Sequence, residues 1–194
     1  MITIKSEDLN LHSLKAISPI DGRHRLMTEP LADWFSEFAL IKYRLFMEVE
    51  YLVALSECVE FKAVRTFTLE EKSFLRNIVK NFTLQDAQIV QNIDRLGYQE
   101  MKATNHDCKA AEYFLKIKMK ESSLQDIIEF VHFGLTSEDM NNVAHDCMIQ
   151  GALKSYYIPG LVSLLDQLAV IAEKEKSTAM LGRTHGQPAT PTTF

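Results

Sequence analysis

Apolar side chains recur at steps of three and four residues along most of this 194-residue chain. The longest run covers residues 33–57 and comprises Trp34, Phe38, Ile41, Leu45, Val49, Leu52 and Leu55. This spacing places the apolar side chains on one face of an α-helix and the polar ones on the other. We therefore predict a long amphipathic helix over residues 33–57.

Two helix starts further along carry a capping signal. Thr68 is followed three residues later by Glu71, and Thr83 in the same way by Asp86. Such a pair satisfies two of the free N–H groups of the first helical turn. Gly97 then supplies the residue type that commonly ends a helix. We predict helices over residues 68–81 and 83–97.

The same periodicity continues to residue 176, apart from a polar break over residues 98–106. We predict further helices over residues 107–120, 124–133, 136–156 and 159–176. Pro159 opens the last of them, because its fixed φ suits the first turn of a helix. No segment alternates between apolar and polar with a period of two, so we predict no strand. The expected fold class is all-α.

The polar segment Glu121-Ser122-Ser123 separates shorter predicted helices from longer ones. We place a boundary here, between an N-terminal helical domain over residues 1–121 and the beginning of a central helical-bundle domain over residues 122–194. Two helices do not form a bundle alone, so we expect the second domain to be truncated at Phe194.

Composition narrows the classes of function. The formal net charge of −5 disfavours nucleic-acid binding, which needs a basic face. The three cysteines lack CxxC spacing and fit free thiols in a reducing compartment. The N-terminus shows no signal peptide, and no run reaches the roughly 18 apolar residues of a membrane span. We expect a cytoplasmic protein that binds neither nucleic acid nor membrane.

Four polar clusters stand between the predicted helices or at helix starts, at residues 18–25, 104–107, 136–142 and 183–191. Arg23 offers a guanidinium fork for a carboxylate or phosphate, or is a surface arginine after a turn. Asp107 can orient and charge His106 for acid–base chemistry, or the two residues only cap a helix. The first two clusters thus leave both interpretations open.

The other two clusters are also polar but differ in how easily capping explains them. Thr136 and Ser137 place hydroxyls at the positive end of a helix, where they bind an anion or serve as N-caps. Arg183 and His185 exceed what a capping loop needs. Together the four clusters favour an enzyme that acts on an anionic substrate.

Taken in order, the clusters resemble the adenylosuccinate lyases, a family of the fumarase/aspartase superfamily. The matching motifs are Ser18-Pro19-Ile20-Asp21-Gly22-Arg23, Thr104-Asn105-His106-Asp107, Thr136-Ser137-Glu138-Asp139-Met140-Asn141-Asn142 and Arg183-Thr184-His185-Gly186-Gln187-Pro188-Ala189-Thr190-Pro191. Their order and spacing agree over essentially the whole chain. The combination is far more specific than any single motif.

The resemblance implies an all-α subunit of three domains, a homotetramer, and active sites built from loops of three subunits. The implied reaction is a β-elimination in purine biosynthesis. It releases fumarate from adenylosuccinate, leaving AMP, and from the succinyl-aminoimidazole carboxamide ribotide. Such a step needs a base, an acid for the departing nitrogen, and donors for carboxylates and phosphate. Neither a cofactor nor a metal is implied.

The resemblance also implies roles for individual residues. His185 would be the general acid. His106 would contact and orient the substrate, together with its neighbours Asn105 and Asp107. The other matching residues would bind substrate: Arg23 and His24 the nucleotide, Thr136 and Ser137 a carboxylate of the succinyl group or of fumarate.

Two features depart from the family pattern. His24 stands where the family commonly has Tyr. The family's general base is a serine on a Gly/Ser-rich loop, and no such segment occurs in this sequence. We therefore expect the N-terminal portion of such an enzyme, inactive by itself.

Two other functions remain open on the residues alone. The pairs His106-Asp107 and His145-Asp146, with His132, would suit a metal-dependent, all-helical phosphohydrolase. No pair, however, has the i, i+4 spacing that puts two ligands on one helix face. Otherwise His132 is a satisfied core histidine and His145 a plain helix residue. The third function is a non-catalytic helical assembly module.

Overall fold

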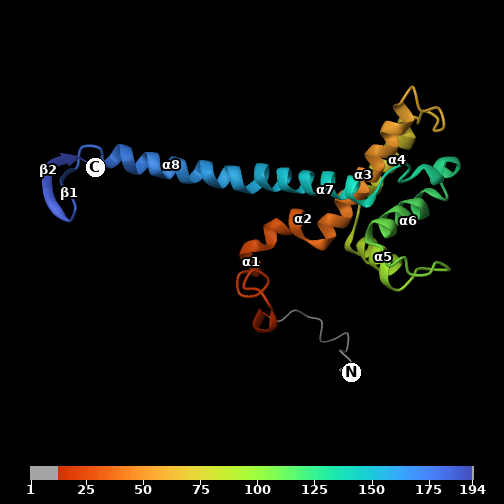
Figure 1. Cartoon of the computed structure of the whole chain (residues 1–194), viewed down its shortest axis with the longest axis horizontal. Coiled ribbons are helices and arrows are strands. Elements are labelled where there is room, and N and C mark those ends of the chain that lie inside the picture. Colours follow the sequence, from red (N-terminus) through yellow and green to blue (C-terminus); the bar gives the residue numbers. More distant parts are fainter. Residues whose placement is uncertain (1–12, 194) are drawn as a thin grey trace. The chain divides into compact units, whose positions relative to one another are not determined.

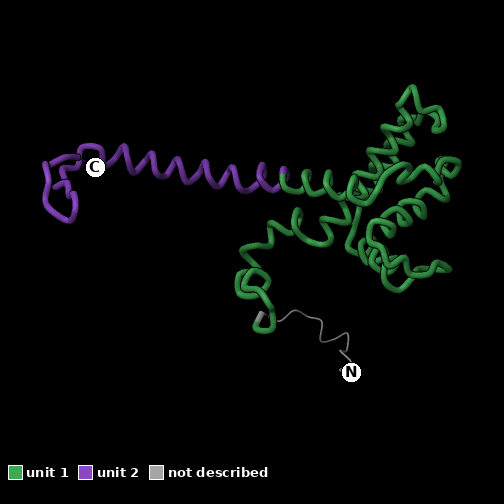
Figure 2. Tube along the Cα trace, viewed as in Figure 1, with its two compact units in different colours: residues 1–149 green, residues 150–194 purple. Residues whose placement is uncertain are grey.

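The computed structural model describes residues 13–193 (Figure 1). Contacts within the chain divide it into two units, residues 1–149 and 150–194 (Figure 2). The chain is mostly helical, as the sequence predicted, and the helices of the first unit enclose its hydrophobic core. The division at residue 149 falls inside a helix, so the expected domain boundary at residue 121 stays a prediction.

The first unit begins with short elements and continues with longer helices. The short ones are the 3₁₀-helices η2 (Ser13–Lys15) and η3 (Glu29–Leu31), and the α-helices α1 (Arg25–Thr28) and α2 (Ala32–Phe35). The longer ones are α3 (Glu37–Glu57), α4 (Leu69–Lys80), α5 (Leu84–Arg95), α6 (Asp107–Met119), the 3₁₀-helix η4 (Gln125–Phe130) and α7 (Ser137–Ala152). The predicted α-helix over residues 124–133 is thus a shorter 3₁₀-helix.

Helix α3 is the element against which α4, α5 and α6 pack. Its stripe of Ile41, Leu45, Val49 and Leu52 is buried as the periodicity predicted. The helix starts later than predicted because Ser36 is extended and caps it, its hydroxyl accepting from the Ala39 N–H at 3.1 Å. Residues before Ser36 form the separate helix α2.

The two predicted capping boxes are confirmed. The Thr68 hydroxyl accepts from the Glu71 N–H at 3.2 Å, and the Glu71 carboxylate accepts from the Thr68 N–H at 2.9 Å. Thr83 and Asp86 make the same reciprocal pair at 3.2 and 3.0 Å. Each box fixes where its helix begins, because it satisfies N–H groups that the helix itself cannot.

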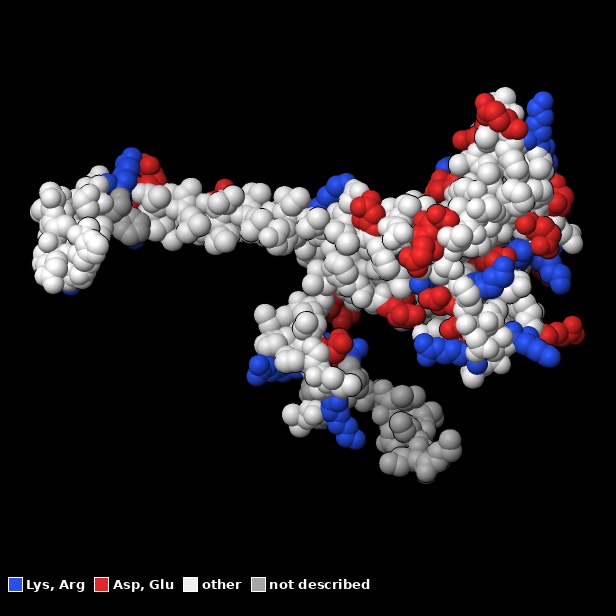
Figure 3. All heavy atoms as spheres, in the orientation of Figure 1, with Lys and Arg blue, Asp and Glu red and all other residues white. Residues whose placement is uncertain are grey.

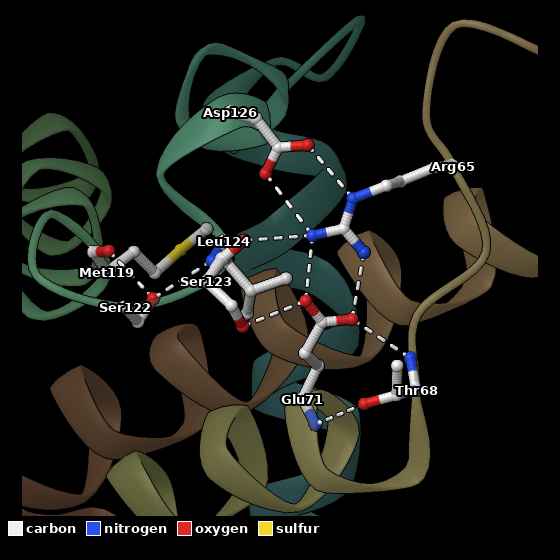
Figure 4. A network of polar contacts seen from close by, with 8 residues as sticks. All are labelled: Arg65, Thr68, Glu71, Met119, Ser122, Ser123, Leu124 and Asp126. Atoms are coloured by element: carbon white, nitrogen blue, oxygen red, sulfur yellow. Dashed lines mark hydrogen bonds and ion pairs between the residues drawn. The ribbon is translucent and has the colours of Figure 1, made fainter.

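Glu71 is also the centre of a polar network that joins three segments (Figure 4). Its carboxylate accepts two hydrogen bonds from Arg65, at 2.7 and 2.8 Å, and one from the Ser123 hydroxyl at 2.9 Å. Arg65 also pairs with Asp126 at 2.9 Å. The network fastens the loop before α4 to the segment around η4.

The helix predicted to end near residue 156 and restart at Pro159 is in fact continuous. A π-helical turn, Leu153–Tyr157, leads from α7 directly into α8, Ile158–Glu175. Pro159 lacks an N–H and normally clashes with the preceding turn of an α-helix. The wider π turn ahead of it, closed by the bond from the Ile158 N–H to the Leu153 carbonyl, accommodates the ring.

The prediction that the chain has no strand is wrong for its last described segment. Strands β1 (Ala179–Thr184) and β2 (Gln187–Thr193) pair as an antiparallel hairpin. Both strands of a two-stranded sheet are edge strands. Edge strands accept proline, which has no N–H to donate to a neighbouring strand, so Pro188 and Pro191 fit here. Neither strand alternates in polarity, which is why the period-two test missed them.

Helix α8 carries large apolar side chains that are all exposed, and Figure 3 shows few charged side chains along it. The continuous helix Ser137–Glu175 contains an 18-residue window of mean hydropathy 1.3. By length and composition it could cross a membrane, so the expectation that no segment passes this test is wrong. The same test is passed by core helices of soluble proteins, so this finding is weak evidence for a membrane span.

Candidate functional site

Two of the four polar clusters meet in the first unit. The imidazole of His106, just before α6, lies 3.2 Å through Nε2 from the hydroxyl of Ser137, at the start of α7. His106 caps α6, and its Nδ1 accepts from the Lys109 N–H at 3.3 Å. A neutral His106 therefore carries its proton on Nε2 and donates a hydrogen bond to the Ser137 hydroxyl. The side chain is half exposed and so accessible to a ligand.

Asp107 is held as a carboxylate beside this histidine. Burial alone would raise its pKa, but the Arg44 guanidinium at 2.7 Å and the Cys108 N–H at 2.8 Å outweigh burial and lower it. The carboxylate oxygen nearest to His106 Nδ1 is 3.7 Å away, too far for a hydrogen bond. Asp107 therefore lies beside His106 without a hydrogen bond to it, and Arg44 holds Asp107 in place.

Arg44 is a residue of this site that the sequence prediction missed. It is buried in α3, and besides Asp107 it donates through Nε to the Asn141 side chain at 2.9 Å. It thereby ties the start of α6 to α7. The signal that could have revealed it is a charged residue inside the apolar stripe of α3, with Glu48 one turn further on.

Thr136 is engaged in the start of α7. Its N–H and its hydroxyl both donate to the Asp139 carboxylate, each at 2.8 Å. These two bonds lower the pKa of Asp139. The geometry is that of helix capping, and it commits both donors of Thr136 to the Asp139 carboxylate.

Asn105 lies next to His106 in a left-handed conformation, with φ of 49°. Its N–H donates to the Asp94 carbonyl at 2.8 Å, and the Thr104 N–H donates to Ile93 at 2.9 Å. These bonds fix the loop before α6 to the end of α5. The Asn105 side chain itself is exposed.

Arg23 and His24 lie near α1 and contact each other. The Arg23 Nε donates to His24 Nε2 at 3.2 Å, and both side chains are exposed. Across residues 13–193, no hydrogen bond or ion pair links either residue to the group around His106. The first cluster is therefore not joined to the second and third by these contacts.

His185 belongs to the second unit, where it forms the tip of the hairpin with Gly186. Both have positive φ, 48° and 75°, as a two-residue type I′ turn requires. The turn presents the His185 side chain to solvent. The sequence prediction of an irregular polar loop thus corresponds to a tight turn between paired strands.

Three neighbouring residues offer metal-ligand types. Ligand atoms of His106, Asp107 and Cys108 lie within 4.8 Å of one another. Arg44 already pairs with Asp107, so its charge opposes a cation there. Burial raises the pKa of the Cys108 thiol, which opposes the thiolate that a metal needs. The residues present therefore suit a polar anchor better than a metal centre.

Comparisons with known proteins agree with the motifs. Residues 22–194 match the model of a family described as lyase. An adenylosuccinate lyase of Dictyostelium discoideum is 45% identical over 96% of this chain and 39% of its own length. Those of Haemophilus influenzae and Escherichia coli K12 are 41% and 39% identical, over 95% and 96% of this chain. The chain spans about 40% of the length of the curated relatives it matches.

Proposed function

The chain belongs to the lyase family, and on that premise we propose that it forms part of an adenylosuccinate lyase. The reaction is the β-elimination of fumarate from adenylosuccinate and from the succinyl-aminoimidazole carboxamide ribotide. The observation that carries the proposal is the contact between His106 and Ser137. It brings together two polar motifs, 31 residues apart, that a helical scaffold alone does not need. The phosphohydrolase alternative is not favoured.

The chemistry divides between this chain and residues outside it. We assign His185 as the general acid that gives a proton to the departing purine nitrogen. A histidine suits this task because its ordinary pKa lies near neutral pH. The base that removes the proton beside the succinyl carboxylate is a serine outside these 194 residues. This chain by itself is therefore inactive.

The remaining site residues bind and orient the substrate. Ser137 and Thr136 hold a carboxylate at the start of α7, where the helix dipole favours an anion. The Thr136 hydroxyl then turns from Asp139 to the ligand. His106 lies beside the bound carboxylate and orients it, because its Nε2 contacts the Ser137 hydroxyl at 3.2 Å. Arg23 and His24 bind the nucleotide. Asn105 and Asp107 contact the substrate together with His106.

We further propose that the protein is a cytoplasmic homotetramer. The exposed apolar side chains of α8 support this, because helices of this kind are buried against other helices. The composition of α8 suits a bundle, since its only charged residue before Glu173 is Asp166. Other copies of the chain are then the partners that cover α8.

The test is turnover by a hybrid protein in which this chain replaces the matching part of the E. coli relative. We expect the hybrid to cleave adenylosuccinate. The reaction is measured as a loss of ultraviolet absorbance by the substrate. His185→Ala lowers kcat of the hybrid about 10²-fold or more, the usual scale for loss of a general acid.

His145→Ala is the matched control, because His145 is an exposed histidine on α7 away from the proposed site. It leaves kcat unchanged. An unchanged kcat in His185→Ala would remove His185 from the acid role. Turnover by the 194-residue chain alone, at the rate of the hybrid, would contradict the assignment of the base to another segment.

A further inference from the structure

Glu48 is a buried carboxylate for which neither the fold nor the proposed chemistry accounts. It lies on α3, and its side chain is 0% exposed. Oε1 contacts His132 Nδ1 at 2.5 Å, whereas Oε2 has no hydrogen-bond partner among the described residues. A buried charge with an unsatisfied oxygen destabilises a fold unless it is compensated. We therefore look for the role of Glu48 in its contact with His132.

His132 lies in the loop that leads from η4 into α7. Its φ of 63° lies in the left-handed region, which few residues other than glycine adopt, and Gly134 two residues on has φ of 71°. The loop therefore turns sharply just before Thr136. A strained backbone persists only where surrounding contacts hold it, so His132 needs a strong anchor.

Helix α3 supplies two anchors for this loop, one turn apart. Glu48 holds the His132 ring, and the Tyr51 hydroxyl donates to the Phe133 carbonyl at 2.9 Å. One turn before Glu48, Arg44 holds Asp107 and Asn141 on the two helices that carry the site. One face of α3 thus contacts the start of α6, helix α7 and the loop before α7.

The charges around His132 come from three helices. The hydrogen bond to Glu48 raises the pKa of His132, burial lowers it less, and the charge of Glu112 on α6 raises it further. Lys109 on α6 opposes these carboxylates. On α7, the charge of His132 adds to the Thr136 bonds that lower the pKa of Asp139. His132 thus acts electrostatically on the carboxylate that holds Thr136.

We propose that Glu48 and His132 form a buried ion pair that positions Thr136 and Ser137. That the turn at Thr136 and Ser137 binds substrate rests on the proposed function, but that the ion pair positions this turn does not. Glu48 fixes the ring of His132, and His132 fixes both the sharp turn and the charge facing Asp139. Asp139 in turn orients the Thr136 N–H and hydroxyl. Both are positioning residues, since they act through the turn.

The test is a pH titration of the 194-residue chain by NMR, following the His132 ring and the amides of Thr136 and Ser137. We expect all three to titrate with one midpoint, above the ordinary histidine value of about 6.5. Glu48→Gln keeps the shape of the side chain but removes its charge, so the midpoint falls toward the ordinary histidine value. His132→Asn removes the titration of both amides, while Asn tolerates a left-handed φ.

Glu129→Gln is the control for charge, because Glu129 is exposed on η4 and pairs with Lys116. It leaves the midpoint of His132 unchanged. The proposal would be overturned if the amide signals of Thr136 and Ser137 in the unmodified chain did not change as His132 titrates. A His132 midpoint that is the same in Glu48→Gln as in the unmodified chain would overturn it too.

Kinetics of the hybrid enzyme separate this proposal from the proposed function. Glu48→Gln and His132→Asn raise KM about tenfold and change kcat much less, because the turn holds the substrate before reaction. A loss of kcat with KM unchanged contradicts the positioning role. A hybrid that does not cleave adenylosuccinate contradicts the proposed function, and the NMR titration then still decides the positioning.

Discussion

At the scale of single residues, three charged groups inside the first unit are matched by partners from other segments. Arg44 pairs with Asp107, Arg65 with Glu71, and Glu48 with His132. Removing one member of such a pair leaves the other desolvated, which costs more than the pair itself contributes. These residues therefore control how the loops between helices are held.

Glu71 gives the clearest residue-scale prediction. Arg65 lowers the pKa of Glu71 from the usual 4.5 to about 2, although burial opposes this. The ionised carboxylate therefore stabilises the fold fully above about pH 5, and this stability is lost as pH falls toward 2. Glu71→Gln should lower the free energy of unfolding by about 1–2 kcal/mol at pH 7, a value discounted because Arg65 is 40% exposed.

The measurement is urea denaturation of both proteins between pH 7 and pH 2. The difference between them should be constant down to about pH 5 and shrink below it, since both then approach the uncharged state. Glu121→Gln is the control at an exposed position and should match the unmodified chain. A difference that is equal at pH 7 and pH 2.5 would show that charge is not the cause.

At the scale of elements, the structure is decided by a few special conformations. The π turn before Pro159 converts two predicted helices into one. The His185–Gly186 turn converts a predicted loop into a hairpin, because positive φ at both positions matches the twist of paired strands. In each case a local backbone state sets the course of a longer segment.

Gly186 and Gly160 give opposite predictions for the same substitution. At Gly186, φ of 75° disfavours any Cβ, so Gly186→Ala should weaken the hairpin by about 1–2 kcal/mol. At Gly160 in α8 a Cβ meets open space, so Gly160→Ala should strengthen the helix by about 0.5–1 kcal/mol. Hydrogen exchange of β1 and α8 amides measures both. Faster exchange of α8 in Gly160→Ala would contradict the helical geometry there.

At the scale of the whole molecule, the two units differ in how they bury apolar surface. The first has a continuous core between α3, α4, α5 and α6. The second has no buried residue in α8, and its apolar side chains face outward. Since isolated apolar patches of this extent mark interaction sites, we expect association with other copies to complete the fold of the second unit.

A pair of charges on α8 tests this association. Leu165→Glu with Leu168→Glu should shift the chain from oligomer to monomer in sedimentation, because burying two carboxylates between helices is strongly unfavourable. Gln167→Glu, a neighbouring polar position, is the control and should leave the oligomer intact. Binding of the unmodified chain to lipid vesicles, without self-association, would instead favour a membrane role for Ser137–Glu175.

A structural feature can be predicted from the sequence when the residues that interact to form it lie close together in the chain. Capping boxes at Thr68 and Thr83, and the buried stripe of α3, were predictable because their partners lie within a few residues. The motif residues were recognisable by type and order. Their roles in substrate binding remain predictions. The helix over Ser137–Glu175 and the hairpin were not predictable from periodicity, since one needs a π turn and the other a ladder between strands that do not alternate.

The sequence by itself therefore determined the helical segments, their capped starts and the residues that resemble a lyase. Only the tertiary structure decided that His106 contacts Ser137, 31 residues away, and that Arg44 reaches Asn141 across 97 residues. Glu48 and His132, 84 residues apart, belong to the same class. The physical reason is that helix signals are local, whereas a buried charge finds its partner only when packing removes water from both.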